Sequence, residues 1–314
     1  MIKTVIIGYG KIAKKHRQVL EELGFEIIAT CNRSVKSNQS SLDDGIPLVY
    51  TDFHKMINEL KPQAIVISVS SEHIYNVATE IIPYSIPLLI EKPTGNSIIE
   101  HNNLIQLSNK YKTDIMVGVN RRFYSLFQKI FKIIGGKEKI TNVLIEWSED
   151  PKKLQTRGYS NEKISNIIFA NSIHGIDMLC WLVGGIKNPL IHTKNLGSFR
   201  LHMNVSGISN EGIIYNFNSC WDSPVPWRIV IYSEDRRFVL APLETLEYID
   251  NKWKKINLKP ENYDIDFKPG FYNQGIAFKE LIKSGSNKKA SLESITNSME
   301  LCQLLYDQLN ILNE

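Results

Sequence analysis

The chain has 314 residues, of which 43% are hydrophobic and 22% charged, and this composition excludes a mainly disordered protein. Its 37 basic and 33 acidic residues are interspersed and leave a formal charge of +4, so we expect no nucleic-acid partner. A chain of this length predicts two domains.

The cysteines and the apolar runs indicate the cellular compartment. The four cysteines are scattered and form no C-x-x-C pair, which argues against a disulfide framework and against a structural zinc site. No apolar run approaches 18 residues, and the chain does not open on a charged region followed by an apolar one. We therefore expect a cytoplasmic protein with no membrane partner and no metal.

The first 120 residues alternate short apolar runs with amphipathic stretches. The stretch 12–23 has helical spacing of its apolar residues and ends before Gly24. The apolar runs predict buried strands at 4–7, 27–30, 64–68, 87–90 and 115–119. Buried strands separated by helices are typical of a parallel sheet covered on both faces. We expect a doubly wound α/β Rossmann domain over residues 1–121.

After about residue 122 the strands alternate apolar and polar residues, as half-buried strands do. They are expected at 142–148, 199–205, 212–218, 228–231 and 237–240. Helices are expected at 172–182, 274–284 and 292–309. The short spacing of the strands predicts a largely antiparallel sheet, so residues 122–314 form an α+β domain in this interpretation.

A glycine-rich turn, G-Y-G-K-I-A at 8–13, follows the first strand and opens the first helix. One glycine permits the tight turn, the second lets the backbone approach a pyrophosphate, and the helix start donates N–H groups to phosphates. The turn therefore predicts dinucleotide binding through Gly8, Tyr9, Gly10, Lys11 and Ile12. The alternative is a tight turn that holds no ligand.

The end of the second strand indicates which dinucleotide is bound. A site selective for NAD usually has an acidic residue here, whereas this chain has Asn32, Arg33 and Ser34. A guanidinium beside two small polar groups suits a 2′-phosphate, which favours NADP over NAD. The alternative is that Arg33 stacks over adenine or points to solvent.

Glu91, Lys92 and Pro93 follow the strand expected at 87–90. The carboxyl ends of strands in a doubly wound sheet form its ligand-binding edge, and the proline restricts Lys92 to an extended backbone. By itself this pattern indicates a surface lysine before a proline turn.

The motifs occur together in one order: the glycine turn followed by His16, then E-K-P at 91–93, N-R-R-F at 120–123 and I-H-G-I-D at 173–177. In this the chain resembles the glucose–fructose oxidoreductase/inositol dehydrogenase (Gfo/Idh/MocA) family over nearly its whole length. The resemblance implies a Rossmann domain, a second domain with an open sheet for substrate binding and oligomerisation, NAD(P), and frequent homo-oligomers. It also implies hydride transfer at a carbon of a sugar, a cyclitol or a nucleotide-sugar.

The resemblance assigns residues to roles. Lys92 corresponds to the active-site lysine of the family and His174 to its catalytic histidine. Ser68, His73, Glu91 and Lys92 are expected beside the cofactor, although the turn 68–73 is as readily a helix-capping turn. Arg122, Arg157 and Asp177 are expected to contact substrate, although one of Arg121 and Arg122 is expected to make a structural ion pair and the loop around Arg157 is as readily solvated.

The segment before His174 departs from the family. Asn171 and Ser172 are good N-cap residues, which would place His174 in a first helical turn, where the helix dipole favours a neutral imidazole able to accept a proton. Many relatives carry an aspartate four residues before this histidine, where this chain has Ala170. The departure argues against a simple inositol dehydrogenase and leaves open a relay through Lys92 and His174, or loss of activity.

Two other functions stay open from the sequence. Some relatives retain their cofactor and cleave glycosidic bonds by transient oxidation. A non-catalytic dinucleotide sensor would also fit the missing aspartate. No residue pattern identifies the sugar or the direction of the reaction.

Overall fold

The computed structural model describes residues 1–160, 164, 166–197, 200–285 and 289–311. The chain divides into two compact units, which we describe separately. The first unit is Met1–Asn120 with Tyr263–Thr296, and the second is Arg121–Asn262 with Asn297–Glu314. Among the described residues, no helix is both long enough and apolar enough to span a membrane.

The first unit contains a six-stranded parallel sheet in the order β3-β2-β1-β4-β5-β6. The strands are β1 (Ile2–Ile7), β2 (Phe25–Cys31), β3 (Leu48–Tyr50), β4 (Ala64–Ile67), β5 (Leu88–Ile90) and β6 (Ile115–Val117). The strand order reverses between β1 and β4, and ligands of doubly wound sheets bind at the carboxyl ends of strands at such a point. The predicted Rossmann fold is confirmed. The short strand β3 was not predicted.

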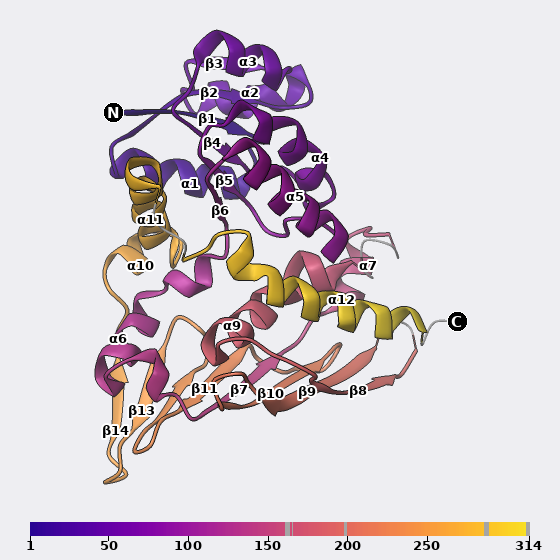
Figure 1. The fold of residues 1–314 in the computed structure, drawn as a ribbon, viewed down its shortest axis with the longest axis vertical. Coiled ribbons are helices and arrows are strands. Elements are labelled where there is room, and N and C mark those ends of the chain that lie inside the picture. Colours follow the sequence, from indigo (N-terminus) through magenta and orange to yellow (C-terminus); the bar gives the residue numbers. More distant parts are fainter. Residues whose placement is uncertain (161–163, 165, 198–199, 286–288, 312–314) are drawn as a thin grey trace. The chain divides into compact units, whose positions relative to one another are not determined.

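Helices cover both faces of this sheet (Figure 1). They are α1 (Lys11–Glu22), α2 (Val35–Asp43), α3 (Phe53–Leu60), α4 (Ser71–Ile81) and α5 (Ile98–Tyr111), with a 3-10 turn at Ile82–Tyr84. Figure 1 shows α1 on the opposite side of the sheet from α4 and α5. The buried β4 strand, A-I-V-I, accordingly has no polar side chain.

The segment Tyr263–Thr296 packs in the first unit, whereas the sequence analysis placed it in the second domain. It contains α10 (Tyr263–Asp266), α11 (Phe271–Ser284) and a 3-10 turn at Glu293–Ile295. Phe278 of α11 stacks on Phe25 with ring centroids 6.0 Å apart, and the Gln274 side chain donates to the Val117 carbonyl at 3.3 Å. These contacts join residues more than 150 positions apart, and helical spacing alone carries no information about them.

The second unit contains an eight-stranded sheet in the order β14-β13-β12-β11-β7-β10-β9-β8. The strands are β7 (Asn142–Trp147), β8 (Leu190–Asn195), β9 (Leu201–Ile208), β10 (Ile214–Cys220), β11 (Arg228–Tyr232), β12 (Arg237–Leu240), β13 (Leu246–Ile249) and β14 (Lys255–Leu258). Strands β7 and β10 pair in parallel, and the other neighbours are antiparallel, as predicted. Residue 199, where a strand was predicted to begin, lies outside the described residues.

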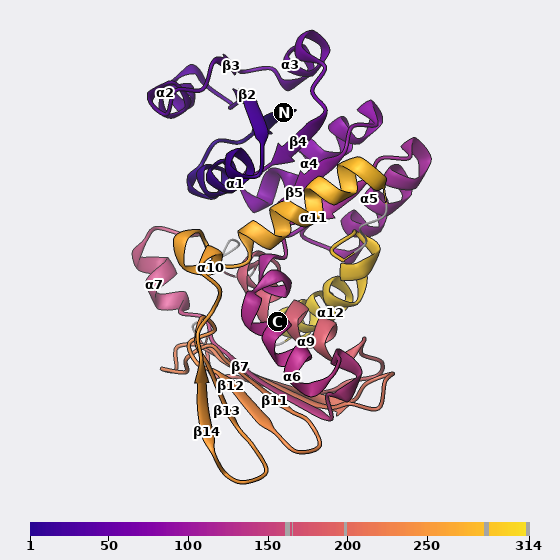
Figure 2. The same ribbon diagram turned by 90° about the vertical axis from the view of Figure 1, so that its left-hand side faces the viewer.

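One face of this second sheet is covered by helices (Figures 1 and 2). They are α6 (Ser125–Ile134), α9 (Ile173–Val183) and α12 (Thr296–Ile311), and the short helix α7 (Pro151–Thr156) follows β7. The opposite face carries no helix of the described residues (Figure 2), so the sheet is open. Trp147, Tyr215 and Phe217 are buried in the core of this unit.

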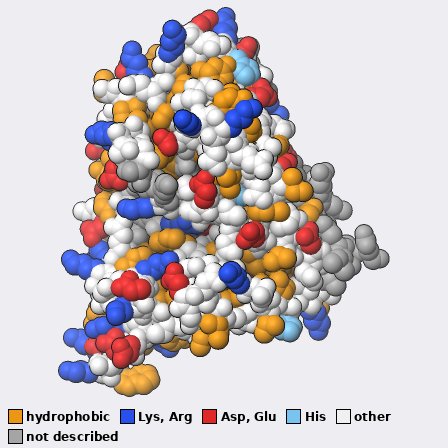
Figure 3. All heavy atoms as spheres, viewed as in Figure 1, with side chains coloured by type: hydrophobic (Ala, Val, Ile, Leu, Met, Phe, Trp, Pro, Cys, Tyr) orange, Lys and Arg blue, Asp and Glu red, His pale blue; other side chains and the backbone are white. Residues whose placement is uncertain are grey.

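The surface has mixed charge. On the face drawn in Figure 3, Lys and Arg side chains are interspersed with Asp and Glu side chains. The lysine-rich piece 252–255 runs from the turn between β13 and β14 into the first residue of β14, and its Trp253 is 86% exposed.

Candidate active site

A cavity of about 550 Å³ opens at the carboxyl edge of the first unit's sheet. The predicted cofactor residues that line it are Gly8, Tyr9, Gly10, Asn32, Arg33, Ser68 and His73. Thr51, Phe53, Asn76 and Val77 also line it and were not predicted. Thr51 and Phe53 follow the three-residue strand β3, which is too short to be recognised by its periodicity. The structure therefore gathers one end of the predicted nucleotide site in a single cavity.

The two glycines of the turn have different roles. Gly8 has φ +85°, and a Cβ there would lie 2.7 Å from the Ser68 carbonyl oxygen, so close packing against β4 requires glycine. A Cβ on Gly10 would meet nothing within 4 Å. Lys11 and Ile12 open α1 and do not line the cavity, and α1 has no acidic residue in its first turn. The open space at Gly10 beside a helix N-terminus fits a phosphate group.

The Asn32 side chain joins β2 to the glycine turn. Its Oδ1 accepts the backbone N–H of Tyr9 at 2.8 Å, and its Nδ2 donates to Asn38 Oδ1 at 3.0 Å. Both ends of the amide are thus used in holding the protein together. This geometry gives Asn32 a structural role, whereas the sequence predicted that it would lie with Arg33 and Ser34 at the 2′-phosphate of the cofactor.

Arg33 lies next to Asn32 and lines the same cavity. A guanidinium N–H of Arg33 lies 3.0 Å from Nε2 of His73, a residue of α4. Ser34 is exposed beside it and is not among the cavity-lining residues. The described lining includes no aspartate or glutamate. The charge of this end of the cavity therefore suits an anion.

The Tyr9 side chain leaves the backbone of the glycine turn and joins a polar network. Its hydroxyl donates to Asp44 Oδ2 at 3.0 Å and accepts from Arg17 at 3.2 Å, while Lys14 pairs with Asp44 at 2.8 Å. Burial raises the pKa of Tyr9, against the opposing effect of Arg17, so the phenol is neutral at ordinary pH. The network ties the glycine turn to the loop after α2.

Glu91 forms a buried pair with His16. Their Oε1 and Nε2 atoms are 2.7 Å apart, and the His16 ring stacks on Phe271. Burial opposes ionisation of Glu91, but the hydrogen bond to His16 and the charges of Lys92 and Lys268 hold its pKa below the usual range. Lys92, the predicted catalytic lysine, is half-buried and follows this anchored carboxylate directly.

In the second unit, the predicted capping of the His174 helix is wrong. A π-helical segment, Ile168–Ser172, runs into α9, so His174 lies beyond the first turn of continuous helical structure. The side chains of Asn171 and Ser172 instead donate to the carboxylate of Glu149 at 2.7 and 2.8 Å. Glu149 is 6% exposed. It was missed because a single glutamate after a strand carries no distinguishing pattern.

Arg122 and Asp177 form a buried ion pair with each other. Two donors of the guanidinium meet the two carboxylate oxygens at 2.8 and 2.5 Å, and Ser298 Oγ donates to the same carboxylate at 2.9 Å. Both residues are less than 8% exposed. The guanidinium and the carboxylate that were expected to contact substrate bond to each other instead. This geometry supports a structural role for both residues.

Arg121 and Arg157 differ from Arg122 in their surroundings. The Arg121 guanidinium lies 5.2 and 5.1 Å from the ring centroids of Trp147 and Trp227, which stack on each other. Burial lowers the pKa of Arg121. Arg157 is exposed at the C-terminal end of α7. Arg122 and Asp177 are buried, so Arg157 is the predicted substrate-binding residue whose charged group is exposed to solvent.

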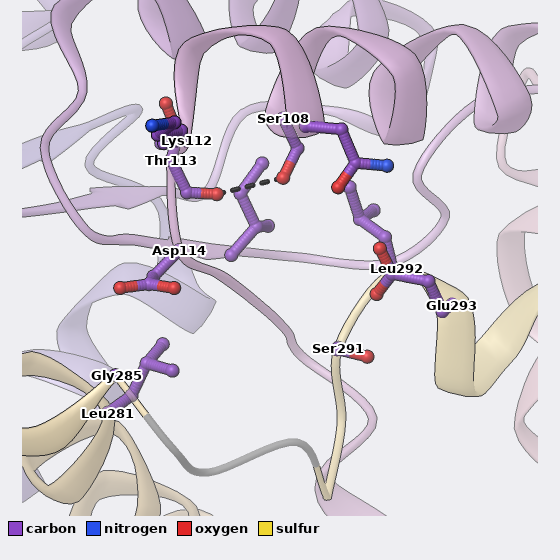
Figure 4. A pocket seen from close by; sticks show the side chains of 11 residues that line it. Ser108, Lys112, Thr113, Asp114, Leu281, Gly285, Ser291, Leu292 and Glu293 are labelled. Carbon is purple, nitrogen blue, oxygen red and sulfur yellow. Dashed lines mark hydrogen bonds between the residues drawn. The ribbon is translucent and has the colours of Figure 1, made fainter.

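A second cavity of about 430 Å³ lies elsewhere in the first unit (Figure 4). Its walls come from the end of α5 and residues 112–115, and from Leu281, Gly285 and residues 291–293. Figure 4 shows the Ser108 hydroxyl bonded to the Thr113 carbonyl within it. This cavity adjoins the amino end of β6, opposite the edge that carries the glycine turn, and contains none of the predicted site residues.

The first unit has a Rossmann fold, with a cavity at the carboxyl edge of its sheet. A family model described as an oxidoreductase family with an NAD-binding Rossmann fold, Gfo/Idh/MocA, matches residues 2–119. This match covers 118 of the 314 residues, and over them it confirms the resemblance seen in the motifs.

Comparison with individual proteins agrees with this family. The chain is 24% identical to inositol 2-dehydrogenase of Salmonella typhimurium over 192 residues, 58% of this chain and 54% of that enzyme, so the match spans about half of the relative. A dehydrogenase (MviM) of Clostridium difficile has the same fold, with a TM-score of 0.81, 20% identity and coverage of 98% of this chain and 99% of that one. UDP-N-acetylglucosamine 3-dehydrogenase GnnA of Acidithiobacillus ferrooxidans has a TM-score of 0.78 and 14% identity, covering 96% of each chain.

Proposed function

We propose that the protein is an NAD(P)-dependent oxidoreductase that transfers hydride between the nicotinamide and a carbon of a sugar, a cyclitol or a nucleotide-sugar. The observation that carries this proposal is the cavity at the glycine turn, which has open space at Gly10 and a cationic end at Arg33. The family match over residues 2–119 supports it.

The residues of the first unit fit a dinucleotide. The glycine turn and the start of α1 would hold the pyrophosphate through backbone N–H groups. Arg33, with Ser34 beside it, would hold a 2′-phosphate, which makes NADP the preferred cofactor and NAD the alternative. Ser68 and Glu91 lie at the carboxyl ends of β4 and β5, along the same edge of the sheet. When bound, the nicotinamide supplies or accepts the hydride.

Two residues are proposed to move the proton. Lys92 follows β5 directly after Glu91, whose carboxylate is paired with His16. His174 is half-buried in α9, and in its neutral form it can accept the proton of an alcohol as the hydride leaves the same carbon. In this proposal the first unit binds cofactor, and the second unit binds substrate and provides His174.

The substrate class rests on relatives. One is an inositol 2-dehydrogenase and another, alike in fold, is a UDP-N-acetylglucosamine 3-dehydrogenase. By their names, one acts on a cyclitol and the other on a nucleotide-sugar. Arg157, exposed on the second unit, is the cationic group we propose for a carboxylate or phosphate on the substrate.

The proposal is tested in two steps. Purified protein, stripped of nucleotide, is titrated with NADPH and with NADH, and wild-type protein is then assayed with a panel of cyclitols, sugars and nucleotide-sugars. Lys92→Ala should abolish turnover while still binding nucleotide, and Lys55→Ala, an exposed lysine of α3, should behave as wild type. Absence of binding of either dinucleotide would refute the proposal, and normal turnover by Lys92→Ala would refute the assignment of Lys92.

We further propose a homo-oligomer that uses the open sheet of the second unit. Ile208 and Ile214 face each other across β9 and β10 and are 65% and 53% exposed, and Leu190 on β8 is 64% exposed. Exposed aliphatic side chains on one sheet face suit a subunit contact. Light scattering of the purified protein should give a mass of at least twice 36.0 kDa, and a monomer would contradict this proposal.

A further inference from the structure

The bond between Arg33 and His73 joins two elements on either side of the glycine turn. Arg33 follows β2 and His73 belongs to α4, which follows β4, and these two strands flank β1 in the sheet. Both side chains line the same cavity, and their nitrogen atoms are 3.0 Å apart. The exposed arginine is therefore held from across the cavity.

The chemistry of arginine decides the direction of this bond. A guanidinium has five N–H donors and no acceptor, so the contact requires Nε2 of His73 to accept. His73 is then a neutral imidazole with its proton on Nδ1. The bond to His73 uses one of the five N–H donors of the guanidinium, and Arg33 keeps its positive charge.

The neighbouring residue cannot take over the role of Arg33. Both ends of the Asn32 amide bond to the protein, to the backbone N–H of Tyr9 and to Asn38. Among the described residues that line the cavity, none carries a carboxylate that could accept from a ribose 2′-hydroxyl. Arg33 is thus the charged group available for the 2′ position of a bound dinucleotide.

We propose that His73 is a positioning residue that holds Arg33 ready for the 2′-phosphate of NADP, so that preference for NADP over NAD depends on the Arg33–His73 pair. The inference rests on the proposed function. An exposed arginine loses rotamer freedom when it binds a phosphate, and a side chain that is already ordered loses less on binding. NADH lacks the 2′-phosphate, so its affinity does not depend on this ordering.

The test measures dissociation constants for NADPH and NADH by nucleotide fluorescence with wild-type protein and five variants. His73→Ala should weaken NADPH binding about fivefold to tenfold, the cost of ordering one long side chain on binding, and change NADH binding less than about twofold. His73→Gln, which keeps a neutral acceptor, should restore most of the NADPH affinity. Lys110→Ala, an exposed lysine of α5, should match wild type.

Arg33→Ala and the double variant Arg33→Ala/His73→Ala complete the cycle. The proposal predicts that the double variant binds NADPH no more weakly than Arg33→Ala alone, because His73 acts through Arg33. It is overturned if the two losses multiply, if His73→Ala weakens NADPH and NADH equally, or if it changes neither. Wild-type protein that binds neither dinucleotide would instead refute the proposed function itself, and this is seen before any variant is made.

Discussion

The two glycines of the turn make a matched pair for the same substitution. In Gly8→Ala the new Cβ would lie 2.7 Å from the backbone oxygen of Ser68 and 2.8 Å from Val69 Cγ1, at φ +85°. Overpacking costs about 1–3 kcal/mol and a left-handed backbone about 1–2 kcal/mol more, so unfolding should become easier by about 2–5 kcal/mol. In Gly10→Ala the Cβ meets nothing within 4 Å and φ is −96°, so stability should stay level or rise by about 0.4–1 kcal/mol.

Nucleotide affinity should fall in Gly10→Ala, although this variant keeps its stability. The open space at Gly10 is where a pyrophosphate would approach the backbone, and a methyl group there should remove one charge-assisted hydrogen bond. That loss is about 1.5–3 kcal/mol, or about tenfold to 150-fold in the dissociation constant for NADPH. Urea unfolding followed by circular dichroism measures the first effect, and fluorescence titration with NADPH measures the second.

Either of two results would contradict these roles of Gly8 and Gly10. Gly10→Ala that binds NADPH as wild type does would mean that no phosphate approaches the backbone at this turn. Gly8→Ala with wild-type stability would mean that the close packing of the turn on β4 does not constrain residue 8.

Three further changes have expected outcomes. Removing one partner of the buried pair, as in Arg122→Ala, should lower the free energy of unfolding by about 3–5 kcal/mol in urea, and Arg122→Met with Asp177→Leu should recover most of it; additive losses would contradict the pairing. Burial lowers the pKa of His101 from 6.5 to about 4, so the unfolded chain takes up a proton first as the pH falls. Stability should then drop by about 3 kcal/mol between pH 6.5 and about 4, and an equal drop in His101→Gln would exclude this cause. Gly118→Ala places a Cβ 2.9 Å from the Glu91 carboxyl group, so it should cost about 1–3 kcal/mol on thermal unfolding, and unchanged stability would show that Glu91 moves freely.

Much of the first unit could be predicted because its signals are local. Runs such as A-I-V-I at Ala64–Ile67 are apolar throughout, since both faces of a parallel strand are buried. Strand β3 escaped prediction because three residues, two of them half-buried, show no such run. In the second unit, alternation of apolar and polar residues predicted β7, β9, β10, β11 and β12. It did not predict β8, β13 or β14.

The site was only partly predictable for a related reason. The positions of Gly8, Arg33 and Lys92 follow from the strands that precede them. Whether a polar side chain faces a ligand or another side chain depends on which groups the fold brings near it. Asn32, predicted to bind the cofactor, bonds to Tyr9 and Asn38, and Glu149 was overlooked.

By itself, the sequence determined the parallel sheet and its glycine turn, because these depend on short-range spacing of apolar residues and glycines. The tertiary structure alone decided that Tyr263–Thr296 packs in the first unit, that Arg122 pairs with Asp177, and that His73 holds Arg33. Each of these is a contact between residues at least 40 positions apart. Such contacts form when the chain folds its distant segments together to bury apolar surface and satisfy buried polar groups, and no local pattern encodes the partner.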